Sequence, residues 1–121
     1  MDYKKMFSLE GRTAVITGGC GYLGREIVKG LVDYGADVFV VDYRISEIEG
    51  ISDPSHIHYI ECDLGNTDDI KAALKTAAGE RGIIDNLITM AANLGAGVMT
   101  DVETMDDAYW QKGIDGTIGY T

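Results

Sequence analysis

The sequence predicts an α/β fold in which one parallel sheet carries helices on both of its faces. Short apolar, β-branched runs recur along the chain, and segments with helical spacing of apolar residues follow several of them. A glycine-rich turn joins the first such run to the first helical segment. These observations indicate the order βαβαβαβα with right-handed crossovers, and place a ligand beyond the carboxyl ends of the strands.

The first strand and the first helix have the clearest patterns. Thr13–Thr17 is a short apolar run that ends in glycines, which is typical of a buried parallel strand that leads into a turn. Leu23, Ile27 and Leu31 then recur at four-residue steps and predict one apolar helical face. Gly35 can end this helix, because glycine readily adopts the backbone conformation that terminates helices.

The later elements follow from similar signals. Three further β-branched runs predict strands, at residues 37–41, 57–60 and 83–89. Asn66 or Thr67 can cap a helix between the last two of these strands. Thr104 and Asp107 resemble a capping box and predict the start of a final helix.

Length and composition exclude several classes of protein. The 121 residues predict a single domain over residues 1–121, and a net charge of -10 makes a nucleic-acid partner unfavourable. The two cysteines lie at no metal-ligand spacing, so we expect no metal site. No signal-like segment or membrane-spanning apolar run is present, and the sequence therefore predicts a cytoplasmic protein without membrane contact.

The turn after the first strand predicts a binding site for the pyrophosphate of a dinucleotide. Gly18 allows a tight turn, Gly21 lets the backbone approach phosphate, and Gly24 permits close packing of the following helix. The free N–H groups of the helix start then face the anion. The other residues expected to line the cofactor here are Cys20, Tyr22 and Leu23.

Asp42 favours NAD as the expected cofactor. It ends the second strand, 18 positions beyond Gly24, where its carboxylate can accept hydrogen bonds from both hydroxyls of the adenosine ribose. A 2′-phosphate would face like charge at this point, although Arg44 is close enough in sequence to keep NADP possible. Tyr43 lies beside Asp42 and is expected to contact the cofactor as well.

Two further segments follow strands at the same predicted edge of the sheet. Asp63 and Leu64 come after the third strand, where a side chain can border the adenine ring. Ala91 and Ala92 come after the fourth strand, where small residues let the backbone approach a ligand. We therefore expect all four residues to bind the cofactor.

The chain resembles the short-chain dehydrogenase/reductase family. The segment 9–19 is similar to its typical opening, Cys62-Asp63-Leu64 looks like its adenine-contacting Asp motif, and 110–117 resembles its fourth helix. The resemblance implies a Rossmann-type doubly wound sheet and the NAD(P)-binding part of an oxidoreductase. Such an enzyme transfers a hydride between nicotinamide and a carbonyl or alcohol of a small-molecule substrate.

Two departures from the family pattern leave an alternative open. The turn has the spacing TGGxGxxG, and Thr89-Met90-Ala91-Ala92 follows the fourth strand, both closer to the family's extended branch. The chain can thus also be the NAD-binding part of a sugar-nucleotide epimerase or dehydratase.

A third departure concerns catalysis. None of the seven tyrosines is followed four residues later by Lys, so the family's Tyr-x-x-x-Lys pair is missing and no catalytic residue is assigned. We expect an incomplete domain, truncated before the catalytic helix and inactive alone, whose exposed fourth strand favours a homo-oligomer. A non-catalytic dinucleotide-binding module is the remaining alternative.

Overall fold

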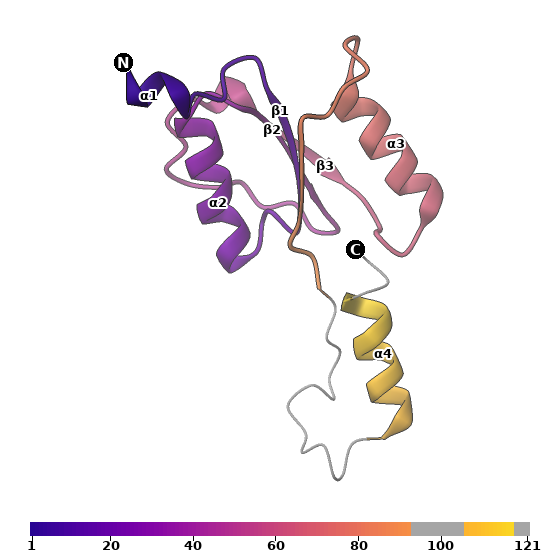
Figure 1. The fold of residues 1–121 in the computed structure, drawn as a ribbon. Coiled ribbons are helices and arrows are strands. Elements are labelled where there is room, and N and C mark those ends of the chain that lie inside the picture. Colours follow the sequence, from indigo (N-terminus) through magenta and orange to yellow (C-terminus); the bar gives the residue numbers. More distant parts are fainter. Residues whose placement is uncertain (93–105, 118–121) are drawn as a thin grey trace. The chain divides into compact units, whose positions relative to one another are not determined.

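The computed structural model describes residues 1–92 and 106–117, which fall into two compact units, Met1–Met90 and Ala91–Thr121. The first unit contains a four-stranded sheet in the order β3-β2-β1-β4, and all three strand pairs are parallel (Figure 1). The strands are β1 (Thr13–Thr17), β2 (Asp37–Asp42), β3 (Ile57–Glu61) and β4 (Asn86–Thr89). The predicted α/β class is confirmed, while the single domain over residues 1–121 stays a prediction.

An α-helix connects β1 to β2 and another connects β3 to β4. The first unit contains α1 (Tyr3–Met6), α2 (Tyr22–Asp33), the 3-10 helix η1 (Pro54–His56) and α3 (Thr67–Ala78). The second unit contains α4 (Asp107–Thr117). Asn66 caps α3, as predicted, because its side chain accepts hydrogen bonds from the N–H groups of Asp68 and Asp69.

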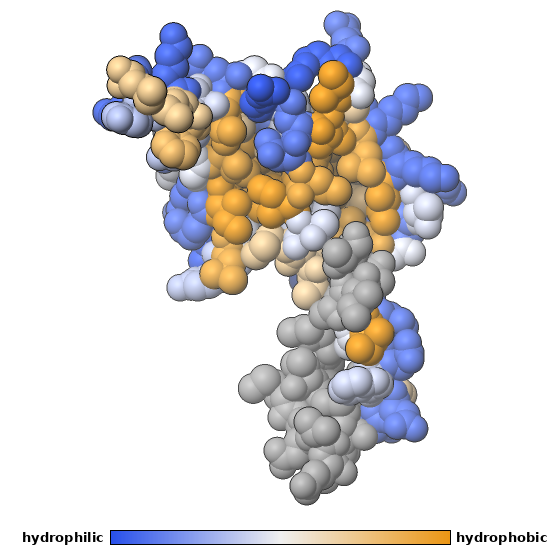
Figure 2. All heavy atoms as spheres, viewed as in Figure 1, coloured by the Kyte–Doolittle hydropathy of each residue, from blue (hydrophilic) through white to orange (hydrophobic). Residues whose placement is uncertain are grey.

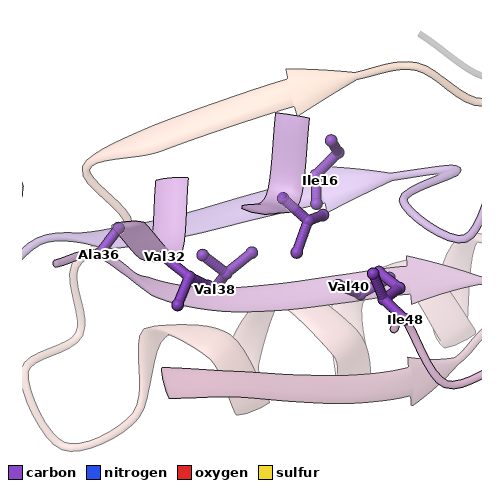
Figure 3. Close-up of a cluster of buried hydrophobic side chains, with 7 residues drawn as sticks. Ile16, Val32, Ala36, Val38, Val40 and Ile48 are labelled. Carbon is purple, nitrogen blue, oxygen red and sulfur yellow. The ribbon is translucent and has the colours of Figure 1, made fainter. Parts of the chain in front are cut away.

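The two faces of the sheet carry separate clusters of buried side chains. Ile16, Val38 and Val40 pack with Val28 and Val32 of α2 on one face, a cluster that also includes Ala36 and Ile48 (Figure 3). The neighbouring strand residues Val15 and Val41 point to the other face and pack with Ala73 and Ala77 of α3. Side chains of β1 and β2 thus point to both faces of the sheet, and a helix covers each face, which is the doubly wound arrangement.

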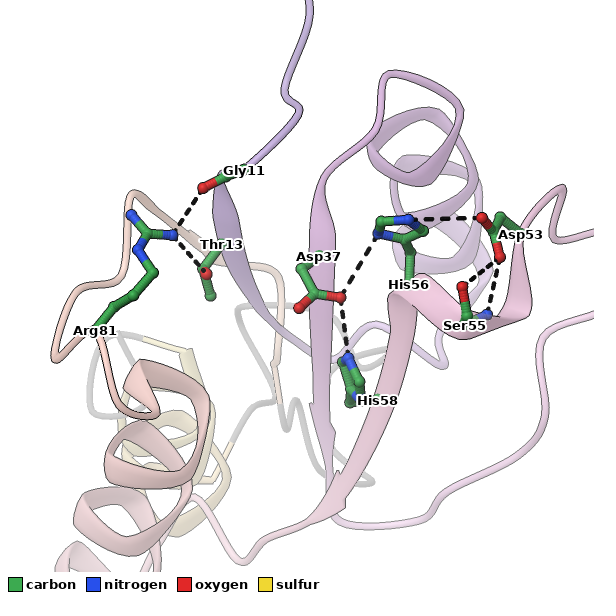
Figure 4. Close-up of polar contacts among 8 residues, drawn as sticks. All are labelled: Gly11, Thr13, Asp37, Asp53, Ser55, His56, His58 and Arg81. Carbon is green, nitrogen blue, oxygen red and sulfur yellow. Dashed lines mark hydrogen bonds and ion pairs between the residues drawn. The ribbon is translucent and has the colours of Figure 1, made fainter.

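Polar side chains tie the amino ends of the strands together. Asp37 Oδ1 lies 3.0 Å from His58 Nε2 and 3.7 Å from His56 Nδ1 (Figure 4). Asp85 accepts a 2.8 Å hydrogen bond from the N–H of Thr13, and this bond is the main reason that the pKa of Asp85 is lowered. These contacts lie at the edge of the sheet where the strands begin. The predicted site lies at the other edge, where the carboxyl ends of the strands are.

Two elements differ from the sequence predictions, and one predicted cap lies outside the described residues. The fourth strand begins at Asn86 instead of Ile83, because its pairing with β1 starts opposite Ala14. Residues 43–56, between β2 and β3, form a loop with only the short η1 in place of a crossover helix. In the second unit the N–H of Ala108 binds Asp106 Oδ1 at the start of α4, whereas the predicted cap Thr104 lies outside the described residues.

β4 is an end strand of the described sheet, and apolar side chains remain exposed around it. Ile83 and Leu87 are 51% and 56% exposed. Figure 2 shows apolar side chains gathered on the viewed face of the first unit, between α2 and α3. Parallel strands usually have both faces covered, so this surface is unusual for a parallel sheet.

Candidate functional site

The turn after β1 has the geometry that its glycines predict. Gly18 adopts a φ of +69°, a conformation that side chains rarely allow. Its N–H donates to Val41 O over 2.8 Å, and the N–H of Gly21 donates to Gly18 O over 3.0 Å. The chain therefore turns sharply at the carboxyl end of β1 and runs directly into α2.

Gly24 and Gly19 make this turn compact. A Cβ on Gly24 would lie 2.3 Å from Gly18 O and 2.8 Å from Gly19 Cα, so α2 approaches the turn more closely than any side chain permits. A Cβ on Gly19 would lie 2.7 Å from Val40 Cγ1, in the buried core. The predicted site left out Gly19, although the Gly-Gly pair that contains it was visible in the sequence.

The start of α2 presents backbone N–H groups at the turn. Gly21 is the N-cap and supplies no side-chain hydrogen bond, and the first helical bond runs from the N–H of Arg25 to Gly21 O over 3.0 Å. The N–H groups of residues 22–24 thus have no partner within the helix. Tyr22 and Leu23 expose 80% and 64% of their surface, so both side chains border open solvent.

The structure brings Asp42 into contact with the turn. Asp42 Oδ2 accepts a hydrogen bond from the N–H of Cys20 over 3.2 Å, and Oδ1 accepts one from the N–H of Arg44 over 3.4 Å. The residue is half-buried at the end of β2. Each carboxylate oxygen keeps a further lone pair, so the group can accept hydrogen bonds from a ligand while it remains bound to the turn.

Cys20 makes a second contact through its side chain, in which Sγ lies 3.4 Å from Ser46 O. The half-buried thiol also packs against the cluster on the α2 face of the sheet. Cys20 thus joins the glycine turn to the loop that follows Asp42. The sequence placed Cys20 at the site but gave no indication that Ser46 is its partner.

Asp63 and Leu64 follow β3, at the same edge of the sheet. The N–H of Cys62 donates to Asp42 O over 2.9 Å, which places the start of this segment beside the end of β2. Asp63 is exposed and its Oδ1 accepts a 2.9 Å hydrogen bond from the N–H of Gly65, so the carboxylate shapes the turn before α3. Burial raises the pKa of the Cys62 thiol, with smaller contributions from Asp69 and Asp63.

Three predicted site residues remain, Tyr43 after β2 and Ala91 and Ala92 after β4. Tyr43 is exposed, and the guanidinium of Arg44 lies 5.4 Å from the centre of its ring. Met90 donates its N–H to Thr17 O over 3.1 Å, which places the end of β4 next to the glycine turn. Ala91 and Ala92 follow directly but belong to the second unit, so their predicted contact with the cofactor remains a prediction.

The described residues contain neither a metal-binding cluster nor a membrane-spanning helix. In residues 1–92 and 106–117, no group of three His, Cys, Asp or Glu side chains is arranged to hold a metal ion. No described helix is both long enough and apolar enough to cross a membrane.

Comparison with known families agrees with the geometry of the turn. The short chain dehydrogenase family matches residues 12–118. The chain belongs to this family. The match includes the glycine turn, Asp42 and the segment after β3, so the predicted site lies within the matched region.

Curated short-chain relatives are similar over most of the chain. Zerumbone synthase of Zingiber zerumbet is 30% identical over 112 residues, which cover 88% of this chain and 41% of that protein. D-xylose 1-dehydrogenase of Caulobacter vibrioides is 34% identical over 113 residues, which cover 89% of this chain and 43% of that protein. The chain thus spans less than half the length of these relatives.

Solved structures show the same fold. A short chain dehydrogenase from Leptospira borgpetersenii, solved with bound NAD+, has a TM-score of 0.78 at 22% identity, and the match covers 99% of this chain and 44% of that one. A short-chain type dehydrogenase/reductase from Mycobacterium ulcerans has a TM-score of 0.75 at 22% identity, over 93% of this chain and 43% of that one. The Rossmann-type fold that the resemblance implied is confirmed.

Proposed function

We propose that this chain supplies the NAD-binding part of a short-chain oxidoreductase. The observation that carries the proposal is the 3.2 Å hydrogen bond between Asp42 Oδ2 and the N–H of Cys20, which holds a carboxylate against the glycine turn. When bound, NAD would supply hydride transfer with a carbonyl or alcohol substrate. Residues beyond this stretch would hold that substrate, since the chain covers 41% and 43% of the relatives described above.

The glycine turn fits a pyrophosphate group. The exposed N-cap Gly21 carries no side chain that could block an anion, and the N–H groups at the start of α2 have no partners within the helix. The positive end of the helix dipole adds to the attraction. Arg25, whose guanidinium lies 5.1 Å from the centre of the Tyr22 ring, adds a cation at the first turn of this helix.

Asp42 supports a preference for NAD over NADP. Its carboxylate can accept hydrogen bonds from the ribose hydroxyls of adenosine, whereas the 2′-phosphate of NADP would meet a negative charge. The N–H of Arg44 binds Asp42 Oδ1, and its guanidinium lies over the Tyr43 ring. This cation reduces the repulsion of the 2′-phosphate, so we expect NADP to bind more weakly than NAD but still to bind.

The NAD-dependent dehydrogenase is favoured over the other two functions that the sequence left open. The family match and D-xylose 1-dehydrogenase both support oxidoreductase chemistry. The turn spacing and the segment Thr89-Met90-Ala91-Ala92 resemble the extended branch. No contact among the described residues adds to them in favour of the sugar-nucleotide epimerase or dehydratase, or of the non-catalytic module.

Isothermal titration of the chain with NAD and with NADP tests the proposal. We expect tighter binding of NAD, and we expect Asp42→Ala to weaken NAD binding about 10- to 100-fold, the effect of losing hydrogen bonds to a charged group. Asp42→Asn keeps an acceptor for Cys20 but removes the charge. It should therefore strengthen NADP binding and reduce the difference between the affinities for NAD and NADP.

Glu80→Gln is the matched control. It removes the same charge from an exposed residue between α3 and β4, at the opposite edge of the sheet. Both cofactors should change in affinity by less than about twofold, because salt screens distant exposed charges. Equal affinity of the unmutated chain for NAD and NADP would contradict the role of Asp42, and the absence of any binding would contradict the proposal as a whole.

A further inference from the structure

The loop between β2 and β3 is anchored to the core although it lacks a crossover helix. Ile48 is only 6% exposed and lies in the cluster between the sheet and α2, where Figure 3 shows it next to Val40. Further along the loop, Ser52 Oγ donates to Asp33 Oδ1 over 2.6 Å and attaches the chain to the end of α2. The loop therefore has fixed points on both sides of Gly50.

Tyr59 provides the acceptor that fixes the backbone of this loop. Its hydroxyl accepts a hydrogen bond from the N–H of Ile48 over 2.8 Å. Tyr59 lies on β3 opposite Val40 of β2, and its half-buried ring packs against the same cluster as Ile48. Since the N–H of Ile48 belongs to a buried residue, removal of the hydroxyl would leave a backbone donor without this partner.

Between Ile48 and Asp42, the loop also contacts the glycine turn. Cys20 Sγ lies 3.4 Å from Ser46 O, and the N–H of the same cysteine binds Asp42 Oδ2. The hydroxyl of Tyr59 thus holds Ile48, the backbone runs from Ile48 back to Ser46, and Ser46 contacts Cys20, which binds Asp42. The stretch 43–47 is held at both of its ends.

We infer that Tyr59 is a positioning residue for cofactor selection, because it fixes the loop that holds Asp42 and Cys20 in their bound arrangement. The inference rests on the proposed function of Asp42 as the acceptor for the ribose of NAD. Tyr59 itself contacts no cofactor in this scheme. It reduces the ordering that NAD binding would otherwise require, and such preorganisation increases affinity.

The two cofactors should respond differently to loss of this anchor. NAD gains from hydrogen bonds to Asp42, so a looser loop lowers its affinity. NADP meets repulsion at the same carboxylate, so it has less to lose. A change in the ratio of the two dissociation constants therefore reports on the positioning of Asp42. A general loss of stability would instead weaken the binding of both cofactors by the same factor.

Tyr59→Phe tests the inference, because it removes only the hydroxyl. We expect the affinity of the chain for NAD to fall about three- to tenfold, the usual range for one hydrogen bond, with a smaller change for NADP. In a double-mutant cycle with Asp42→Ala, the Phe substitution should cause no further loss of NAD binding. Cys20→Ala, which breaks the contact with Ser46 from the other side, should reduce the preference for NAD in the same direction.

Tyr34→Phe is the control, since it removes the hydroxyl of an exposed tyrosine at the end of α2. It should leave both dissociation constants unchanged. An unchanged NAD/NADP ratio in Tyr59→Phe, or an equal loss in the Asp42→Ala background, would overturn the inference while leaving the proposed function intact. Failure of the unmutated chain to bind either cofactor would overturn the proposed function and the inference together.

Discussion

The close approach of α2 to the glycine turn predicts opposite effects for alanine at two positions of one helix. A Cβ on Gly24 would lie 2.3 Å from Gly18 O, and both this oxygen and the Gly19 Cα at 2.8 Å belong to the backbone. The turn would have to move to accept a methyl group. A Cβ on Gly30, in the same helix, would meet nothing within 4 Å.

These contacts determine the sign and size of each effect. Overpacking against backbone costs about 1–3 kcal/mol, and the better helix propensity of alanine returns about 0.5–1 kcal/mol. Gly24→Ala should therefore lower the free energy of unfolding by up to roughly 2.5 kcal/mol. Gly30→Ala gains the propensity without the collision and should raise the free energy of unfolding by about 0.5–1 kcal/mol.

Urea denaturation followed by circular dichroism at the helix band measures both values. The midpoints of the two variants should move in opposite directions from that of the unmutated chain. Gly24→Ala should also weaken NAD binding, because the displaced turn includes the N–H groups proposed to face the pyrophosphate. A Gly24→Ala chain as stable as Gly30→Ala would refute the reasoning about close packing.

Two further predictions concern titratable groups. The pKa of Asp85 is lowered, chiefly by the N–H of Thr13, so its stabilising effect is complete above about pH 4 and disappears as pH falls through the lowered value. Asp85→Asn should lower Tm at pH 7, and a difference from the unmutated chain that persists unchanged down to pH 2 would contradict this. The half-buried Cys20 should react with a thiol reagent before the buried Cys62, whose pKa is raised. Cys20→Ser should abolish the fast phase, and simultaneous reaction of both thiols in the unmutated chain would argue against the assignment.

Much of the first unit could be predicted because local patterns and tertiary packing agree there. The apolar run at Thr13–Thr17 forms β1 with the predicted bounds, and Asn66 caps the third helix. The glycine spacing correctly indicated a tight turn between a strand and a helix, because only glycine allows the positive φ of Gly18 and the close approach at Gly24.

The contacts that hold the site together were not visible in the sequence. Cys20 and Asp42 are 22 positions apart, and Tyr59 reaches Ile48 across the connection between two strands. Neither pair has a periodic signal. The Cys20–Asp42 bond depends on how the turn after β1 meets the end of β2, and the Tyr59–Ile48 bond depends on where the loop 43–56 lies on the folded sheet. The fourth strand was predicted too long for a similar reason, because its pairing begins only opposite Ala14 of β1.

An NMR titration of the ¹⁵N-labelled chain with NAD tests whether the glycine turn binds the dinucleotide. We expect the largest shifts at the backbone amides of residues 20–24, which form the turn and the start of α2, and at Asp42. Amides at the opposite edge of the sheet, such as those of Thr13 and Asp37, should shift little. Unchanged amides at residues 20–24 in the presence of millimolar NAD, or shifts confined to other elements, would contradict the assignment of this turn as the dinucleotide site.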